Sequence, residues 1–319
     1  MKLKRIFLMA LSTVLLGSMV GCGNAENNSN TQDSASTDGK KVVTIGYLPI
    51  THALPVFEEK EILDQEDDGI AIKLQKFSSW SDLTDALNSG RIDGASVLIE
   101  LAMSAKSQGI DLKAVALGHK DGNVVVVSND INSVADLKGK TFAIPHTQSS
   151  HNILLNDMLV KEGVSIDDIN ITQLAPSEMP SSLASGSIAG YCVAEPFGAQ
   201  AVSQDIGKVL YYSEDLWENS LCCGLVFNGN DIENNKDTVD TFIDKYYEAG
   251  SKLDKDTSKE IASKYLGQTD DVLEVSLEWI KYDDLTINQD DYSQLCDKVV
   301  SYGILDNPPT YEEFVYEKD

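Results

Sequence analysis

The residues best suited to binding chemistry follow short apolar runs that we expect to be β-strands. Thr51 and His52 come after the first run, at a helix start where free backbone N–H groups attract anionic or carbonyl oxygens. The loop His146–His151 follows a later run and is dense in hydrogen-bond donors, including Gln148 and Ser149. We interpret this loop as the strongest candidate for contact with a polar head group, with a plain helix cap as the alternative role for its serines.

Three more positions lie at the ends of expected strands: Trp80 and Glu195 each follow a strand, and Asn123 lies at the entry to one. Trp80 begins a helix after an expected strand, and its spacing to Leu83 also suits a plain core residue. The amide of Asn123 can donate to a planar oxyanion, although Asp-Gly-Asn is also ordinary turn sequence. Glu195 precedes a proline, where a carboxylate can accept from a ligand, hold a cation beside a bound anion, or simply favour the helix start. The predicted ligand-binding residues are therefore Thr51, His52, Trp80, Asn123, Gln148, Ser149, His151 and Glu195.

Catalytic and metal motifs are not evident in the sequence. We find no phosphate loop, no ordered Ser-His-Asp set and no calcium loop, so we expect a binding protein and not an enzyme. Cys192, Cys222, Cys223 and Cys296 lack paired CxxC spacing, which argues against a zinc site and favours buried apolar roles. A disulfide between two distant cysteines stays open. We expect no cofactor, apart from the cation that Glu195 would hold with the ligand.

The elements that must position these residues form an α/β pattern. From Lys41 onward, short apolar runs alternate with helical periodicity, which is typical of mainly parallel sheets flanked by helices. One set of units spans 41–127, a second spans 128–224, and 225–319 is mainly helical. The runs Val124–Ser128 and Leu221–Phe227 have the composition of buried strands and are expected to connect the two sets.

The N-terminal region reads as an export signal. Three cations precede the apolar run Ile6–Leu16, which is too short to span a bilayer. The sequence Gly17–Cys22 resembles the lipobox of bacterial lipoproteins, which predicts a signal peptide over 1–21, lipidation of Cys22 and a membrane anchor. Residues 22–40 are polar and are predicted to be a disordered tether. Without residues 1–21 the net charge of -26 becomes about -29, which excludes nucleic acid as a partner.

Several motifs resemble one family, the periplasmic-type binding proteins for nitrate, bicarbonate, aliphatic sulfonates and the thiamine pyrimidine precursor. The matching segments are Gly46–Ala53, Trp80–Ala95, Asp136–Lys140, Tyr191–Phe197, Tyr302–Leu305 and Pro309–Val315. Ile144-Pro145-His146 and the Cys-Val-x-Glu-Pro sequence are most similar to the nitrate and bicarbonate branch.

The resemblance implies a two-lobed periplasmic binding protein-like fold of type II. It also implies that Trp80 forms an aromatic wall of the ligand site. Lobe 1 would comprise 41–127 and 225–319, and lobe 2 would comprise 128–224. It also implies a monomer on the extracytoplasmic face of the cell membrane that captures a small polar or anionic solute for an ABC permease and its ATPase. A thiamine-precursor pyrimidine is the alternative solute. A pyrimidine-synthase-like enzyme of the same fold is a more distant alternative.

Overall fold

The computed structural model describes residues 39–66 and 68–318 of the 319-residue chain. The predictions for the signal peptide (1–21), for lipidation of Cys22 and for nearly all of the tether (22–40) lie outside the described residues. All described residues belong to one compact unit of the chain.

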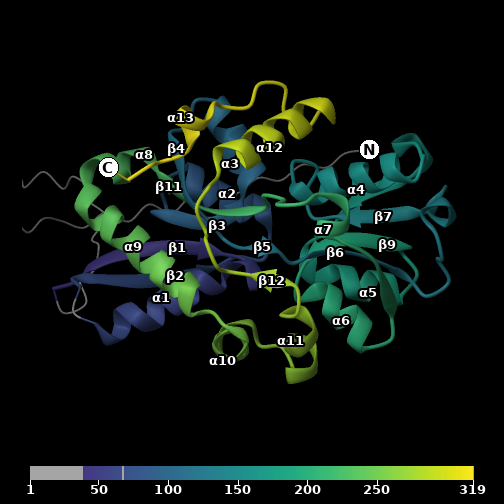
Figure 1. Ribbon diagram of the computed structural model, residues 1–319, viewed down its shortest axis with the longest axis horizontal. Coiled ribbons are helices and arrows are strands. Elements are labelled where there is room, and N and C mark those ends of the chain that lie inside the picture. The colour runs from purple at the N-terminus through teal and green to yellow at the C-terminus, as the bar shows by residue number, and fades with distance from the viewer. Residues whose placement is uncertain (1–38, 67, 319) are drawn as a thin grey trace, which may run out of the picture. The chain divides into compact units, whose positions relative to one another are not determined.

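The first sheet contains four strands that run in one direction and one that runs against them. The strand order is β2–β1–β3–β11–β4 (Figure 1), with β1 (Lys41–Tyr47), β2 (Ile70–Lys76), β3 (Gly94–Leu98), β4 (Leu112–Leu117) and β11 (Cys223–Asn228). β2 and β3 pair with β1 in parallel, whereas β11 is antiparallel to both β3 and β4. All five residues of β3 are buried, as expected for a central strand covered on both faces.

The second sheet repeats this arrangement. Its order is β10–β6–β9–β7–β8, with β6 (Asn123–Ser128), β7 (Thr141–Ile144), β8 (Asn170–Gln173), β9 (Gly190–Ala194) and β10 (Gly207–Tyr212). β7 is parallel to β8 and β9, and β6 is antiparallel to β9 and β10. The expectation of an α/β protein with mainly parallel sheets is therefore confirmed.

The two strands expected to connect the lobes each belong fully to one sheet. β6 pairs with β9 and β10, so the chain leaves the first sheet between β4 and β6, earlier than the expected boundary at residue 127. The chain returns to the first sheet at the start of β11, close to the expected boundary at 224. Sequence composition identified both buried strands, but only the pairing assigns each strand to a sheet.

Helices follow most strands and pack against the sheets. Those before β11 are α1 (Leu54–Gln65), α2 (Trp80–Asn88), α3 (Ile99–Ser107), α4 (Ser150–Lys161), α5 (Met179–Ala184), α6 (Phe197–Ser203) and α7 (Ser213–Leu216). Those after it are α8 (Gly229–Asn234), α9 (Lys236–Lys252), α10 (Lys255–Leu266), α11 (Asp270–Ser276), α12 (Gln289–Ser301) and α13 (Tyr311–Phe314). Short 3-10 turns are η1 (Thr51–Ala53), η2 (Val134–Leu137), η3 (Ile166–Asp168) and η4 (Pro176–Glu178), and β5 (Lys120–Asp121) pairs with β12 (Ile280–Lys281).

Within the described part of the chain, none of these helices combines the length and the apolar character of a membrane span.

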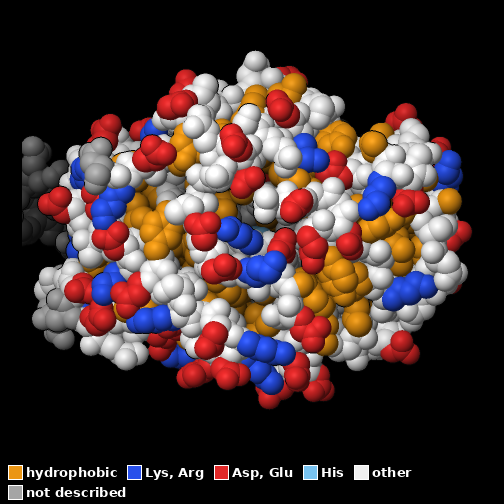
Figure 2. All heavy atoms as spheres, in the orientation of Figure 1, with side chains coloured by type: hydrophobic (Ala, Val, Ile, Leu, Met, Phe, Trp, Pro, Cys, Tyr) orange, Lys and Arg blue, Asp and Glu red, His pale blue; other side chains and the backbone are white. Residues whose placement is uncertain are grey.

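Buried apolar side chains of both sheets, such as Ile45 and Val126, belong to one continuous core. Acidic side chains are spread over the face shown in Figure 2, with basic side chains among them. This surface is consistent with the strongly negative net charge.

Candidate functional site

The first sheet carries polar side chains at the edge where its parallel strands end. His52 lies in η1 after β1, Glu100 lies in the first turn of α3 after β3, and His119 follows β4. Cys222 and Cys223 stand at the start of β11. Because β11 is antiparallel to its neighbours, its start lies at the same edge as their ends.

The second sheet carries polar side chains at its equivalent edge. Ser150 and His151 begin α4 after β7, and Glu195 follows β9. Asn123 is the first residue of β6, which is antiparallel and pairs Asn123 with Ala194 at the end of β9. Each of these four polar residues is at most 1% exposed.

Hydrogen bonds join the two edges directly. The backbone N–H and the hydroxyl of Thr51, in the first sheet, both donate to the carbonyl oxygen of Glu195, in the second, at 2.9 and 3.0 Å. The side-chain amide of Gln148, from the loop before α4, donates to the Ser104 hydroxyl in α3 at 3.1 Å. The strand ends of the two sheets therefore face each other, as the strand-end rule predicts for a ligand site.

A hollow beside these contacts is also bordered by both sheets. Its volume is about 260 Å³, and its lining includes Ile50 and Phe77 near the first sheet and Pro176 and Phe197 near the second. Loops of the two halves thus share one crevice.

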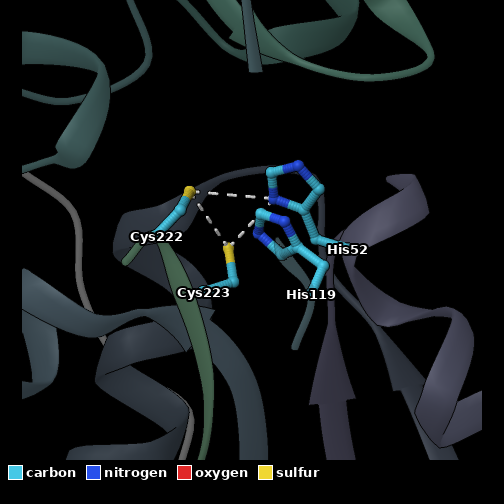
Figure 3. Close-up of side chains that lie close together, drawn as sticks. All are labelled: His52, His119, Cys222 and Cys223. Atoms are coloured by element: carbon cyan, nitrogen blue, oxygen red, sulfur yellow. Dashed lines mark hydrogen bonds between the residues drawn. The ribbon is translucent and has the colours of Figure 1, made fainter. Parts of the chain in front are cut away.

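Two histidines and two cysteines form a tight cluster in the interior. Figure 3 shows the sulfur atoms of Cys222 and Cys223 turned toward the rings of His52 and His119. His52 Nδ1 lies 3.4 Å from Cys223 Sγ and 3.7 Å from Cys222 Sγ, and the two sulfurs are 3.8 Å apart. The rings of His52 and His119 are stacked with centroids 3.4 Å apart. One potential ligand atom from each of the four residues falls within 4.8 Å of the others.

Cys192, Cys222 and Cys223 are buried, as we expected, and Cys296 is half-buried. Cys222 and Cys223 also lie in this cluster. Spacing along the sequence argued against a metal-type site, but the fold brings Cys222 and Cys223 together with two histidines more than 100 positions away in the chain. All four cysteines of the described region are free, so none forms the disulfide that the sequence left open. Glu195, where we expected a cation, lies outside the His-Cys group among the residues described.

Several buried polar atoms around the cluster have no hydrogen-bond partner within the described residues. They are both carboxyl oxygens of Glu100, Nε2 of His119, Nδ2 of Asn123, Oγ of Ser150 and both ring nitrogens of His151. Cys222 lies close enough to Glu100 and His151 to influence the pKa of each, and its thiol is 3.8 Å from Asn123 Oδ1. Since buried polar groups in proteins are almost always paired, this concentration of unpartnered atoms makes the region our candidate site for a polar ligand.

Burial determines the protonation of the site. It lowers the pKa of His52 to about 4, assisted by the neighbouring His119, so that the His52 imidazole is neutral near pH 7. Burial raises the pKa of Glu100 well above its usual range and that of Glu195 to about 8. Burial opposes ionisation of Cys222, but its contacts with Cys223 and His52 lower the pKa of this thiol. Near pH 7 a protonated Glu195 therefore carries no negative charge that would repel an anion.

The predicted residues divide by what their side chains already contact. The Thr51 hydroxyl is already hydrogen-bonded to the Glu195 carbonyl. The Ser149 hydroxyl caps α4: it accepts from the Asn152 N–H and donates to the His146 carbonyl. The Glu195 carboxyl accepts from the Ala199 N–H at 2.8 Å, which agrees with the alternative role at a helix start. His52, Asn123 and His151 lie in or beside the His-Cys cluster.

Trp80 is buried in the main apolar core, and its Nε1 has no partner among the residues that the structure describes. Both the core interpretation and the ligand-wall interpretation of this residue therefore remain compatible with its position. Its role in binding stays a prediction.

The predicted ligand-binding residues did not include Glu100, His119, Cys222 or Cys223. Glu100 lies in the first turn of α3, directly after β3. Cys222 precedes and Cys223 begins an antiparallel strand, whereas, apart from Asn123, we inspected only residues that follow strands. A search that also included the starts of antiparallel strands would have found them.

Comparison with known proteins gives consistent relationships. Residues 36–267 match the model of a family described as NMT1-like. The ligand-binding component of an ABC-type import system from Staphylococcus aureus, solved with zinc bound, is 39% identical over 86% of this chain and 96% of that chain, with a TM-score of 0.82. The alkanesulfonate-binding protein SsuA from Xanthomonas axonopodis pv. citri, bound to MOPS, shares the fold with a TM-score of 0.73 at 20% identity, over 86% of this chain and 98% of that chain.

Among curated relatives, the nitrate import ATP-binding protein NrtC of Synechocystis sp. is 29% identical over 195 residues. The match covers 54% of this chain and 29% of that relative. This chain therefore corresponds to less than a third of the relative's length.

Proposed function

Because the chain belongs to the NMT1-like family, we propose that it is the solute-binding subunit of an ABC importer, capturing a small polar solute between its two sheets and releasing it unaltered. The family resemblance found in the sequence is confirmed, and so is the two-lobed α/β fold that it implied. The observation that carries the proposal is the set of buried, unpartnered polar atoms that both sheets contribute.

The two sheets contribute complementary groups to this set. Glu100 lies at the edge of the first sheet, and Asn123 and His151 lie at the edge of the second. Each buried polar atom without a partner costs about 1–3 kcal/mol. A solute that hydrogen-bonds to both sets removes this cost only when the sheets are close together, so its binding favours the closed arrangement.

The donors and acceptors indicate the class of solute. The Asn123 amide is a donor, neutral His151 offers one donor and one acceptor, and the raised pKa of Glu100 leaves its carboxyl protonated. A small oxyanion beside Glu100 would therefore face a neutral carboxyl group and not a carboxylate. The names of the relatives point to nitrate and sulfonates, and bicarbonate belongs to the same chemical class. A thiamine-precursor pyrimidine, with ring acceptors and an amino donor, is retained as the alternative solute.

The proposal extends to location and partners. The lipobox-like sequence supports an anchor through lipidated Cys22 on the extracytoplasmic face, and the polar segment 22–40 would tether the protein to it. A permease and an ATPase would receive the solute, as in the import systems for which the relatives are named. The same names support a binding role over an enzymatic one, and we expect the protein to act as a monomer.

Thermal unfolding with a panel of solutes tests the proposal. A compound that binds only the native state raises the melting temperature, so we expect one class among nitrate, bicarbonate, aliphatic sulfonates and hydroxymethylpyrimidines to do so. His151→Ala should abolish most of the shift because it removes the second-sheet histidine of the buried set. His146→Gln, at a half-buried histidine of the same loop, is the matched control and should retain the shift.

The ligand class is wrong if no member of the panel stabilises the protein and an unrelated sugar or peptide does. The location of the site is wrong if the stabilising compound shifts the His151→Ala variant as much as the wild type.

A further inference from the structure

We propose that His52, His119, Cys222 and Cys223 form a binding site for a thiophilic divalent cation, with Zn²⁺ as the representative ion. The site goes beyond solute capture, because its four ligands come from the first sheet alone and do not depend on which solute is carried.

The spacing of the ligand atoms matches tetrahedral coordination. With Zn–S bonds of about 2.3 Å and Zn–N bonds of about 2.0–2.1 Å, the ligand atoms of a tetrahedral site lie about 3.3–3.8 Å apart. The three distances among His52 Nδ1, Cys222 Sγ and Cys223 Sγ are 3.4, 3.7 and 3.8 Å. These three atoms are therefore already placed as one face of a coordination tetrahedron, and His119 offers a fourth ligand atom within 4.8 Å of the other three.

The far nitrogen of each imidazole is directed at a backbone carbonyl. Nε2 of His52 lies 3.3 Å from the Gly122 oxygen, and Nδ1 of His119 lies 2.6 Å from the Asp121 oxygen. A carbonyl accepts only from a protonated nitrogen, so each contact places the N–H on the outer side and the lone pair on the inner side of the ring. Metal-bound histidines in proteins are oriented by this arrangement.

The inner nitrogens are the ones that face the sulfurs or lack a partner. His52 Nδ1 is directed at both cysteines, and His119 Nε2 is buried without a hydrogen-bond partner within the described range. A cation would satisfy both lone pairs at once. A thiol hydrogen bond to His52 would satisfy only one of them.

Charge balance favours the same conclusion. All four side chains are at most 1% exposed, where an isolated ionised group is costly. Two thiolates, two neutral imidazoles and one divalent cation sum to zero charge. The ion therefore allows both cysteines to ionise without leaving net charge in the interior.

The ligand types define the chemistry of the ion. Two sulfurs and two imidazole nitrogens in a tetrahedron suit Zn²⁺ and exclude the hard ions Mg²⁺ and Ca²⁺, which require oxygen ligands. Co²⁺ occupies such sites in the same geometry and reports on them through its absorption spectrum.

Metal titration of the purified, reduced protein tests the proposal. We expect one equivalent of Zn²⁺ to be bound in competition with a chromophoric chelator. We also expect Co²⁺ to produce the intense visible bands of a tetrahedral site together with thiolate-to-cobalt charge transfer in the near ultraviolet. Cys222→Ser and Cys223→Ser should each reduce the charge transfer and weaken Zn²⁺ binding by more than the roughly 10- to 100-fold that loss of an outer hydrogen-bond partner costs.

Cys296→Ser is the matched control, because Cys296 is a half-buried thiol of α12 outside the cluster, and this variant should bind both ions like the wild type. The proposal is overturned if wild-type protein binds Co²⁺ without sulfur charge transfer. It is also overturned if Zn²⁺ affinity is unchanged in folded Cys222→Ser, Cys223→Ser double variants. The Co²⁺ spectrum of the wild type decides the matter even if a cysteine variant does not fold, and none of these outcomes depends on the solute.

Discussion

Replacing Glu195 by glutamine should remove a specific pH dependence from the stability of the protein. Glu195 is fully buried, and burial raises the pKa of its carboxyl from an ordinary value of 4.5 to about 8. Between these two pKa values the native protein holds a proton that the unfolded chain has released. The unfolded state thus binds fewer protons, and the contribution of Glu195 to the free energy of unfolding falls as pH rises through this window.

The size of the effect follows from the two pKa values. Linkage gives a loss of about 2–3 kcal/mol between about pH 5.5 and about pH 7.5, levelling off above about pH 8. Glutamine is neutral throughout, and its side-chain oxygen can still accept from the Ala199 N–H that Glu195 now binds. The difference in unfolding free energy between wild type and Glu195→Gln should therefore decline by that amount over this range.

Urea unfolding at a series of pH values, followed by circular dichroism, measures this difference. Buried His52 and His151 have lowered pKa values and change stability in the opposite direction, but they are present in both proteins and cancel in the comparison. A difference that stays flat or grows with pH would show that Glu195 is ionised in the native protein, which would refute our account of its environment.

Three further changes test separate parts of the structure. Cys22→Ala should move the protein from the membrane fraction to the soluble fraction, and continued membrane association would exclude the lipid anchor. Gly122→Ala should lower the free energy of unfolding by more than about 1 kcal/mol, because φ is +81° and the added Cβ would lie 2.7 Å from Ile280 Cδ1. The control is Gly163→Ala, where φ is +66° and the Cβ would meet open space. It should lower stability less in the same melting assay. Ser149→Ala should cost about 1 kcal/mol through loss of the α4 cap and leave solute binding intact, whereas loss of binding would return Ser149 to the ligand site.

Much of the fold could be predicted from local sequence patterns. The alternation of apolar runs and helical periodicity depends on neighbouring residues only, so it identified most strands and the α/β class. The assignment of β6 to the second sheet could not be predicted in this way, because it depends on pairing with β9 and β10, which are distant in the chain. Composition shows that a strand is buried but does not show which sheet buries it.

The site could be predicted where ligand residues follow parallel strands. This rule identified His52 and His151, which the structure places near the same thiol. It overlooked Cys222 and Cys223 because β11 is antiparallel, which brings the start of the strand to the binding edge. Their association with His119 comes from the insertion of β11 beside β4, a feature of the folded chain that sequence spacing does not encode.

A crystal structure of the protein with the solute that stabilises it would test the central claim most directly. We predict that the bound molecule hydrogen-bonds at the same time to Glu100, at the edge of the first sheet, and to Asn123 or His151, at the edge of the second. A solute bound in contact with one sheet only, with those three side chains left unchanged, would contradict capture between the two halves of the molecule.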